Sequence, residues 1–342
     1  MSKAQGVPVP AGRSGAVIRA DFLQRFLAFG ALIVLILFFQ TWCVAIGTNF
    51  LTFENFVNIL VATAVVAIMA LGETFVIITG GIDLSVGTVM TISMVMTAIT
   101  ITSQGLPVPV GIVVGILTGG LFGLVNGVLI ARFKIAPFIA TLGVLNVARG
   151  LSLVVTQTRP IYFPNNPEFQ SGVMGNIFGL NISGQFGIPN IAVIMFGAAI
   201  VAAFVLGKTV LGRYTFALGS NEEAARLSGV NVANWKMLVY AVCGLFSGLA
   251  GVLMAARLGS AQPATGFGYE LSAISAVVIG GTSLSGGEGT ILGTVIGAFI
   301  VYVLTYGLQF VNVAQEWQIV VTGVVLIAAV YIDNLRRRNQ RA

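Results

Sequence analysis

Three ionisable side chains lie inside long apolar segments of the sequence: Glu73, Asp83 and Arg149. A charge in the apolar interior of a bilayer costs on the order of 3 kcal/mol on insertion scales, so such groups are usually paired or functional. A carboxylate there can hydrogen-bond a polar solute or carry an ion, which makes Glu73 and Asp83 candidates for a solute pathway. Two structural alternatives stay open. Arg149 can pair with Glu73, or Asp83 can cap a helix with support from Ser85.

Amide and hydroxyl side chains in apolar surroundings form a second group of candidates. Asn126 and Asn146 fall within apolar segments, where an unpaired amide is costly. Hydrogen bonding between helices explains both equally well. Gln262, Tyr269 and Glu270 fall near the ends of later apolar segments, where an arriving solute would meet them. The pathway candidates together are Glu73, Asp83, Ser85, Asn126, Asn146, Gln262, Tyr269 and Glu270.

Several kinds of chemistry are excluded by residue type. The sequence has no His, which removes Ser-His-Asp hydrolysis, His proton relays and His-ligated zinc. Both Cys, Cys43 and Cys243, lie in apolar runs, so a disulfide framework is not expected. No Gly-x4-Gly-Lys-Ser/Thr phosphate loop occurs, so the chain cannot hydrolyse ATP unaided. We expect no enzyme, no metal site and no cofactor in this chain.

A short capped helix is predicted within the charged segment 208–236. Asn221 is suited to cap it, Glu222 and Glu223 complement the dipole of its first turn, and Gly229 suits a left-handed end. About two turns of helix are not stable alone, so this one needs a surface to lie on. The predicted docking helix comprises Asn221, Glu222, Glu223, Ala224, Ala225, Arg226 and Gly229.

Two surfaces could receive this helix. One is the membrane face, with Leu227 and Val230 as the packed residues. The other is a groove on a cytoplasmic partner, which would leave the apolar side chains of the helix for that partner.

The composition predicts the transmembrane helices that position these residues. The chain has 342 residues, 57% of them apolar and 8% charged, against about 45–50% and about 25% in soluble domains. We predict an all-α polytopic membrane protein with about ten transmembrane helices, since about 17–25 apolar residues cross a bilayer. Glycine pairs at Gly80-Gly81 and Gly286-Gly287 could break the third, eighth and ninth into re-entrant turns. The predicted spans are 26–46, 59–79, 84–103, 110–131, 138–156, 189–207, 237–257, 271–287, 290–310 and 317–332.

Basic residues give the orientation. With an internal N-terminus, the segments 1–25, 132–137, 208–236 and 333–342 hold 14 of the 17 Lys and Arg and lie in the cytoplasm. The positive charge is therefore a topology signal, and nucleic acid is not an expected partner. Residues 1–25 are read as a cytoplasmic tail, 26–332 as the transmembrane domain and 333–342 as a second cytoplasmic tail. The segment 157–188 is then an external loop.

An internal echo accompanies the glycine pairs. Residues 80–87 read GGIDLSVG and residues 280–287 read GGTSLSGG, with five of eight positions identical. Internal repeats with interrupted helices are common in transporters, where the break often lines the solute site. The alternative is chance recurrence of small residues in glycine-rich helices.

Four ordered blocks resemble one family. Glu223-Ala224-Ala225, three residues and then Gly229 match the E-A-A-x-x-x-G pattern of permease subunits of bacterial ATP-binding cassette (ABC) importers. The segment 211–232, LGRYTFALGSNEEAARLSGVNV, is similar to the coupling loop of monosaccharide permeases of the ribose and xylose type. GGIDLSVG, FIATLG with the later RG (138–150) and the segment 256–290 resemble that family too. The resemblance covers nearly all of the chain from about residue 50.

The resemblance implies an import complex in the bacterial inner membrane. This chain would be its transmembrane permease subunit, with both termini cytoplasmic, moving a monosaccharide or related polyol. ATP would be bound by a separate cytoplasmic ATPase subunit, which receives the docking helix. A periplasmic sugar-binding protein would supply the sugar, and a second permease copy or a paralogue would complete the pathway within the membrane lipid.

Two other functions stay open. A branched-chain amino-acid permease shares the broader superfamily, although 80–87 and 256–290 favour the sugar branch. An ion-coupled secondary transporter needs intramembrane acids, for which only Glu73 and Asp83 qualify, and it leaves the E-A-A pattern unexplained. A membrane-embedded enzyme would need clustered catalytic side chains that the sequence lacks.

Overall fold

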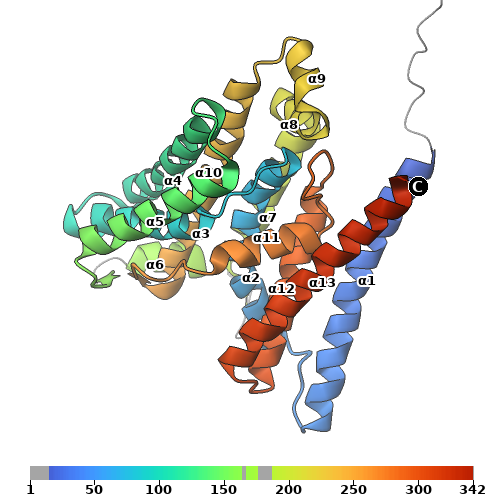
Figure 1. Ribbon diagram of the computed structural model, residues 1–342. Helices are drawn as coiled ribbons and strands as arrows, with labels where there is room; N and C mark the ends of the chain where they lie inside the picture. The colour runs from blue at the N-terminus through green and yellow to red at the C-terminus, as the bar shows by residue number, and fades with distance from the viewer. Residues whose placement is uncertain (1–14, 164–166, 176–186, 342) are drawn as a thin grey trace, which may run out of the picture.

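The computed structural model describes residues 15–163, 167–175 and 187–341. This part of the chain is almost wholly helical, and one antiparallel pair of two-residue strands is the exception (Figure 1). The all-α prediction is confirmed. The elements are α1 Gly15–Ala45, α2 Phe53–Ile78, α3 Val86–Ala98, the π-helix η1 Ile99–Ser103, α4 Val108–Ala131, α5 Pro137–Thr156, β1 Ile161–Tyr162, α6 Pro167–Met174, α7 Asn190–Lys208, α8 Val210–Ser220, α9 Glu222–Leu227, α10 Val232–Leu258, β2 Ser260–Ala261, α11 Tyr269–Ile279, α12 Ile291–Phe310 and α13 Gln315–Arg341.

Eight of the described helices are long and apolar enough to cross a membrane. Each coincides with one of the predicted spans, and the tenth predicted span, 317–332, lies within α13. The span predicted at 271–287 is wrong as a continuous crossing. α11 has 11 residues, about 16 Å at 1.5 Å per residue, roughly half of an apolar bilayer core. The helix ends where Gly281 takes a left-handed φ of 89°, before the pair at which a break was expected.

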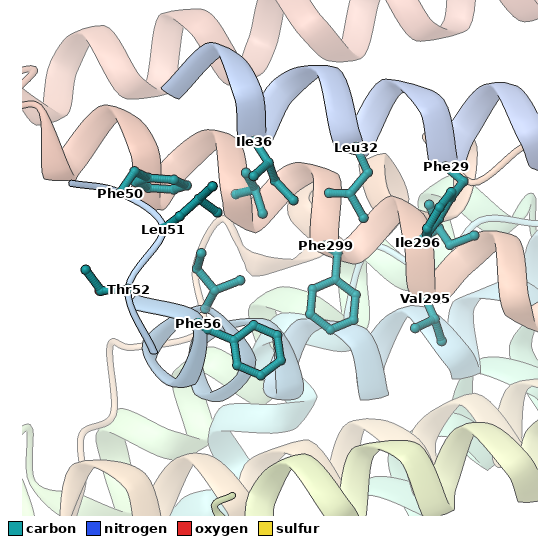
Figure 2. A pocket seen from close by; sticks show the side chains of 12 residues that line it. Phe29, Leu32, Ile36, Phe50, Leu51, Thr52, Phe56, Val295, Ile296 and Phe299 are labelled. Carbon is teal, nitrogen blue, oxygen red and sulfur yellow. The ribbon is translucent and has the colours of Figure 1, made fainter. Parts of the chain in front are cut away.

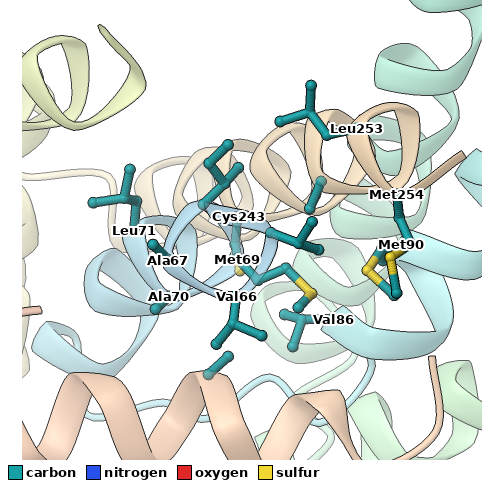
Figure 3. Close-up of a cluster of buried hydrophobic side chains, with 14 of the residues drawn as sticks. Val66, Ala67, Met69, Ala70, Leu71, Val86, Met90, Cys243, Leu253 and Met254 are labelled. Carbon is teal, nitrogen blue, oxygen red and sulfur yellow. The ribbon is translucent and has the colours of Figure 1, made fainter. Parts of the chain in front are cut away.

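α2 forms the centre of the molecule. Its residues 62–78 are all buried, as expected for a helix that is apolar on every side. The core around it combines Val66, Met69 and Leu71 of α2 with Met90 of α3 and Leu253 of α10 (Figure 3). This placement puts Glu73 in the middle of the protein core.

Glycines let α4 and α10 approach closely. A Cβ on Gly119 or Gly123 of α4 would overlap the carbonyl oxygens of Gly244 and Tyr240 of α10. Small residues at four-residue spacing permit this kind of backbone contact between membrane helices. The two helices therefore form one rigid pair.

The start of α1, the end of α13 and the helix α9 lie at the same end of the molecule (Figure 1). This agrees with the predicted placement of both termini and of 208–236 on one side. Residues 1–14 of the predicted tail, and 164–166 and 176–186 of the predicted external loop, lie outside the described residues.

Candidate functional site

α9 is built as its sequence predicts. The Asn221 side-chain oxygen accepts a hydrogen bond from the Ala224 N–H at 2.9 Å, which caps the helix. Glu222 and Glu223 occupy its first turn, and Gly229 has a φ of 85°. The sequence did not predict α8, the 11-residue helix that precedes the cap.

Two ion pairs fix the charges of α9. Glu222 accepts from Lys236 at 2.6 Å and so ties α9 to α10. Glu223 accepts from Arg226 at 2.6 Å on the exposed face. That hydrogen bond and the charge of Glu223 raise the pKa of Arg226, so its guanidinium stays charged.

Besides the Glu222–Lys236 pair, one buried side chain packs α9 against its own chain. Ala225 is 7% exposed and packs with Leu218 of α8 and Val232 of α10. Leu227 is 78% exposed, so it is available to either of the two predicted surfaces, the membrane or a cytoplasmic partner. Within the described part of the protein, the outer face of α9 presents Glu223, Arg226 and Leu227 to solvent.

Three segments meet behind α9 at what we call the glycine junction: Ile78–Gly80, Gly219–Ser220 and Gly286–Gly287. The Gly287 N–H donates to the Ile78 carbonyl oxygen at 2.8 Å. A Cβ on Gly219 would overlap that same oxygen, and one on Gly286 would lie 3.0 Å from Gly80 N. The junction is therefore backbone against backbone, and it joins the docking segment to both echoed turns.

Each of the two echoed turns begins with a left-handed glycine, at positions one residue apart in the alignment of 80–87 with 280–287. Gly80 follows α2 with a φ of 78°, and its N–H donates to Ile77 O at 2.9 Å. Gly281 follows α11 with a φ of 89°, and its N–H donates to Val278 O at 2.9 Å. Both are left-handed helix terminations of the kind glycine favours.

The second half of each turn is also alike. The Ser85 N–H donates to the Asp83 carboxylate at 2.8 Å, and the Ser285 N–H donates to the Ser283 hydroxyl at 3.1 Å. In both turns a side chain accepts from the backbone two residues later. Equivalent positions differ elsewhere: Gly80 is left-handed whereas Gly280 has a φ of −66°, and Gly286 and Gly287 are left-handed whereas Val86 and Gly87 begin α3. The internal repeat therefore stays a prediction.

A buried polar cluster lies beyond the first turn. Asp83 accepts from the Ser85 hydroxyl at 2.6 Å and from the Asn126 amide at 3.2 Å. Glu73 accepts from the Asp83 N–H at 2.9 Å, and the Cys243 thiol lies 3.7 Å from its other oxygen. These side chains are fully or almost fully buried and link α2, α3, α4 and α10. Asp83 does not cap α3: the N-cap residue is Ser85, which has no side-chain capping bond, and Asp83 accepts from Ser85 within the turn. Asn126 bonds from α4 to this turn.

Arg149 does not pair with Glu73. It is exposed on α5, and its guanidinium lies 4.8 Å from the centre of the Phe267 ring. Glu73 takes its hydrogen bonds from Asp83 and Cys243 instead. A cation over an aromatic face is favourable and leaves the charge near solvent.

The remaining pathway candidates lie outside the cluster. Asn146 is exposed and its amide donates to Leu142 O in its own helix at 3.0 Å, so an interhelical bond is wrong for it. Gln262 is exposed after β2, and Tyr269 is half-buried at the start of α11. Glu270 is buried and accepts from the Gly268 N–H at 3.0 Å.

Sequence reasoning missed two members of the site. Gly219 carried no signal beyond its place in the charged segment, and Tyr240 looked like an ordinary core residue. The Tyr240 hydroxyl is buried without a hydrogen-bond partner among the described residues, and it lies against Gly81.

A cavity of about 520 Å³ lies elsewhere, between α1, α2 and α12 (Figure 2). Its lining is mostly apolar and includes Phe29, Leu32, Phe56 and Phe299. The polar lining residue is Thr52. Binding sites for polar solutes place several hydrogen-bonding groups in such a space. This groove lacks them, so it is suited to lipid tails.

Comparison with known proteins places the chain. A sequence profile described as branched-chain amino acid transport system / permease component matches residues 55–330. The chain belongs to this permease family. Among curated relatives, the permease is 42% identical to the ribose import permease protein RbsC of Escherichia coli (strain K12), over 90% of this chain and 92% of the relative.

Other relatives are similar over comparable lengths. The permease is 42% identical to the ribose import permease protein RbsC of Bacillus subtilis (strain 168), over 91% of this chain and 93% of the relative. It is 33% identical to the xylose transport system permease protein XylH of Escherichia coli (strain K12), over 97% and 96%. No solved structure matches the chain. Family and fold together make it a multi-pass membrane permease.

Proposed function

We propose that this chain is the transmembrane subunit of an ABC importer that moves a monosaccharide or related polyol into the cytoplasm. The observation that carries the proposal is the 42% identity to a ribose import permease over 90% of the chain. The relatives named for ribose, fructose and xylose favour a sugar over the branched-chain amino acids in the family's description.

The proposal includes a division of labour. A separate ATPase subunit binds ATP, because this sequence has no phosphate loop. It docks on the open face of α9, where Glu223, Arg226 and Leu227 offer charge beside an exposed apolar side chain. The end carrying α9 and both termini, including 1–25 and 333–342, is then cytoplasmic, and a binding protein delivers sugar to the opposite end.

Coupling follows the contacts behind α9. A displacement of α9 moves α8, whose Gly219 touches Ile78 and Gly287 through the backbone. The glycine junction passes this movement to the turns that follow α2 and α11. From the first turn it reaches Asp83 and Asn126. Because the contacts at the glycine junction are between backbone atoms, a small displacement of α8 moves the turns after α2 and α11 directly.

The pathway candidates divide into two groups. Gln262, Tyr269 and Glu270 are proposed for the external mouth, where sugar arrives. Glu73, Asp83, Ser85 and Asn126 are buried within one chain, so we assign them the task of holding the pathway helices in register. Asn146 lies on an exposed face, and we propose that it meets sugar only if the second permease copy or a paralogue covers that face.

Reconstituted uptake tests the function. The chain is placed in lipid vesicles with its ATPase and binding protein, and uptake of labelled pentoses, hexoses and polyols is measured. ATP-dependent uptake of one sugar is expected, with none when the ATPase is omitted. Uptake driven by an ion gradient without the ATPase would establish a secondary transporter and refute the proposal.

The same assay tests α9. Glu223→Lys replaces the exposed ion pair by two cations and should lower ATP-driven uptake at least about tenfold, while the chain stays folded. Leu106→Ser removes an exposed apolar side chain at the opposite end and should leave uptake unchanged. Full uptake by Glu223→Lys would remove α9 as the docking element.

A further inference from the structure

A second cavity, of about 210 Å³, lies at the end of the molecule that carries α9. It opens where α4 ends, α5 begins and α10 starts. Its charged lining consists of Lys134 from the α4–α5 connection, Glu222 from α9 and Lys236 from α10. Neither transport nor the buried cluster accounts for the basic side of this cavity.

The cavity carries positive charge that its own residues do not neutralise. Glu222 is held by Lys236 at 2.6 Å, so these two charges offset each other. Arg132, two residues before Lys134, donates to the Asn234 side-chain oxygen at 2.9 Å. Among the described residues, neither Arg132 nor Lys134 has a carboxylate within ion-pair distance. The free charge of the site is positive, so it suits an anion.

The basic rim is held in place. Lys134 has a φ of 58°, a left-handed conformation that is uncommon for residues other than glycine. Hydrogen bonds on both sides maintain it: the Phe133 N–H donates to Val128 O at 3.3 Å, and the Ile135 N–H to Leu129 O at 3.2 Å. These bonds fix the backbone from which the Lys134 side chain extends toward the cavity.

Two exposed aromatic side chains lie close to Lys134 in the sequence, outside the cavity lining. Phe133 is 69% exposed, between Arg132 and Lys134, and Phe138 is 59% exposed in the first turn of α5. Aromatic residues concentrate where membrane meets water, with cations reaching the headgroups. The cavity therefore offers a cation beside apolar lining residues such as Ile130 and Ile135, with exposed aromatic rings on adjacent residues, which suits a lipid better than a free phosphate.

We propose that the cavity between α4, α5 and α10 binds the headgroup of an anionic phospholipid. Lys134, which lines the cavity, contacts its phosphate, and Phe133 and Phe138, exposed outside the lining, lie beside its acyl chains. Basic pockets at the cytoplasmic ends of transmembrane helices suit such headgroups. Because Glu222 belongs to both the cavity and α9, a bound lipid also lies directly beside the docking helix.

Lipid titration of the purified full-length chain tests the site. Native mass spectrometry follows binding of phosphatidylglycerol and, separately, phosphatidylcholine. Phosphatidylglycerol should bind more tightly. Lys134→Gln should weaken its binding about fivefold, the effect of one basic side chain near an anionic surface, and leave phosphatidylcholine unchanged.

Matched variants separate this site from general charge. Lys208→Gln removes an exposed cation at the end of α7, outside the cavity, and should leave phosphatidylglycerol binding unchanged. Lys134→Arg keeps the charge and should retain the affinity. Equal losses in Lys134→Gln and Lys208→Gln would mean diffuse attraction and overturn the proposal. Displacement of the lipid by millimolar inorganic phosphate would overturn it too, by revealing a soluble ligand.

Discussion

Asn126 joins α4 to the turn between α2 and α3 through its bonds to Asp83 and Ser85. In the apolar core each of these groups would be costly without the others, so the cluster acts as a unit. Asn146, of the same type and also in an apolar helix, donates only to its own helix on an exposed face. Both residues were candidates for the solute pathway because of their type. Their surroundings differ, since Asn126 is buried in the polar cluster and Asn146 is exposed.

Replacing Asn126 and Asn146 in turn compares what each contributes to the stability of the fold. Asn126→Ala removes an amide donor from Asp83 and the Ser85 hydroxyl and should lower the free energy of unfolding by about 1–3 kcal/mol. Asn146→Ala should change it by less than about 0.5 kcal/mol. Thermal and denaturant unfolding of the purified variants measures both. Equal losses would show that the cluster does not stabilise the fold.

At the scale of elements, α8, α9 and the two glycine turns form one mechanical unit. α9 is too short to stand alone, and its position depends on Ala225 and on the Glu222–Lys236 pair. The turns after α2 and α11 reach the unit through the glycine junction. Under the coupling that we propose, the turns at 80–87 and 280–287 receive the same displacement, because both contact Gly219–Ser220 or Ile78 through the backbone.

Gly219→Ala tests that unit. Its Cβ would overlap the Ile78 carbonyl oxygen, so the junction must shift at a cost of about 1–3 kcal/mol. ATP-driven uptake should fall strongly, with ATP hydrolysis less affected because the ATPase still docks on α9. Gly207→Ala, in α7 with open space around it, is the control and should transport normally. Normal uptake by Gly219→Ala would show that coupling bypasses the junction.

At the scale of the whole molecule, α9, the start of α1 and the end of α13 share one end (Figure 1). Basic residues in 132–137 and 208–236 lie at that end as well, which predicts that it faces the cytoplasm. Cys43 and Cys243 are free and buried, so a thiol reagent will label only cysteines introduced at the surface.

Labelling from each side tests the orientation. Ser228→Cys, exposed beside α9, should react with a membrane-impermeant maleimide only from the cytoplasmic side. Ser103→Cys, exposed at the end of η1 and at the opposite end of the molecule, should react only from outside. The reverse pattern would invert the proposed topology and place α9 away from any ATPase.

The sequence by itself determined the membrane class, eight of the spans and the short capped helix α9, because apolar length and capping residues act locally. The cap at Asn221 and the left-handed Gly229 need only their neighbours, so their types were sufficient. Tertiary structure decided what depends on distant partners. The predicted span 271–287 is the shorter helix α11 in the structure, and Arg149 lies over Phe267 instead of pairing with Glu73. The contact between Gly219, Ile78 and Gly287 likewise depends on the tertiary structure. Those outcomes depend on which helix faces meet, and no local pattern encodes that.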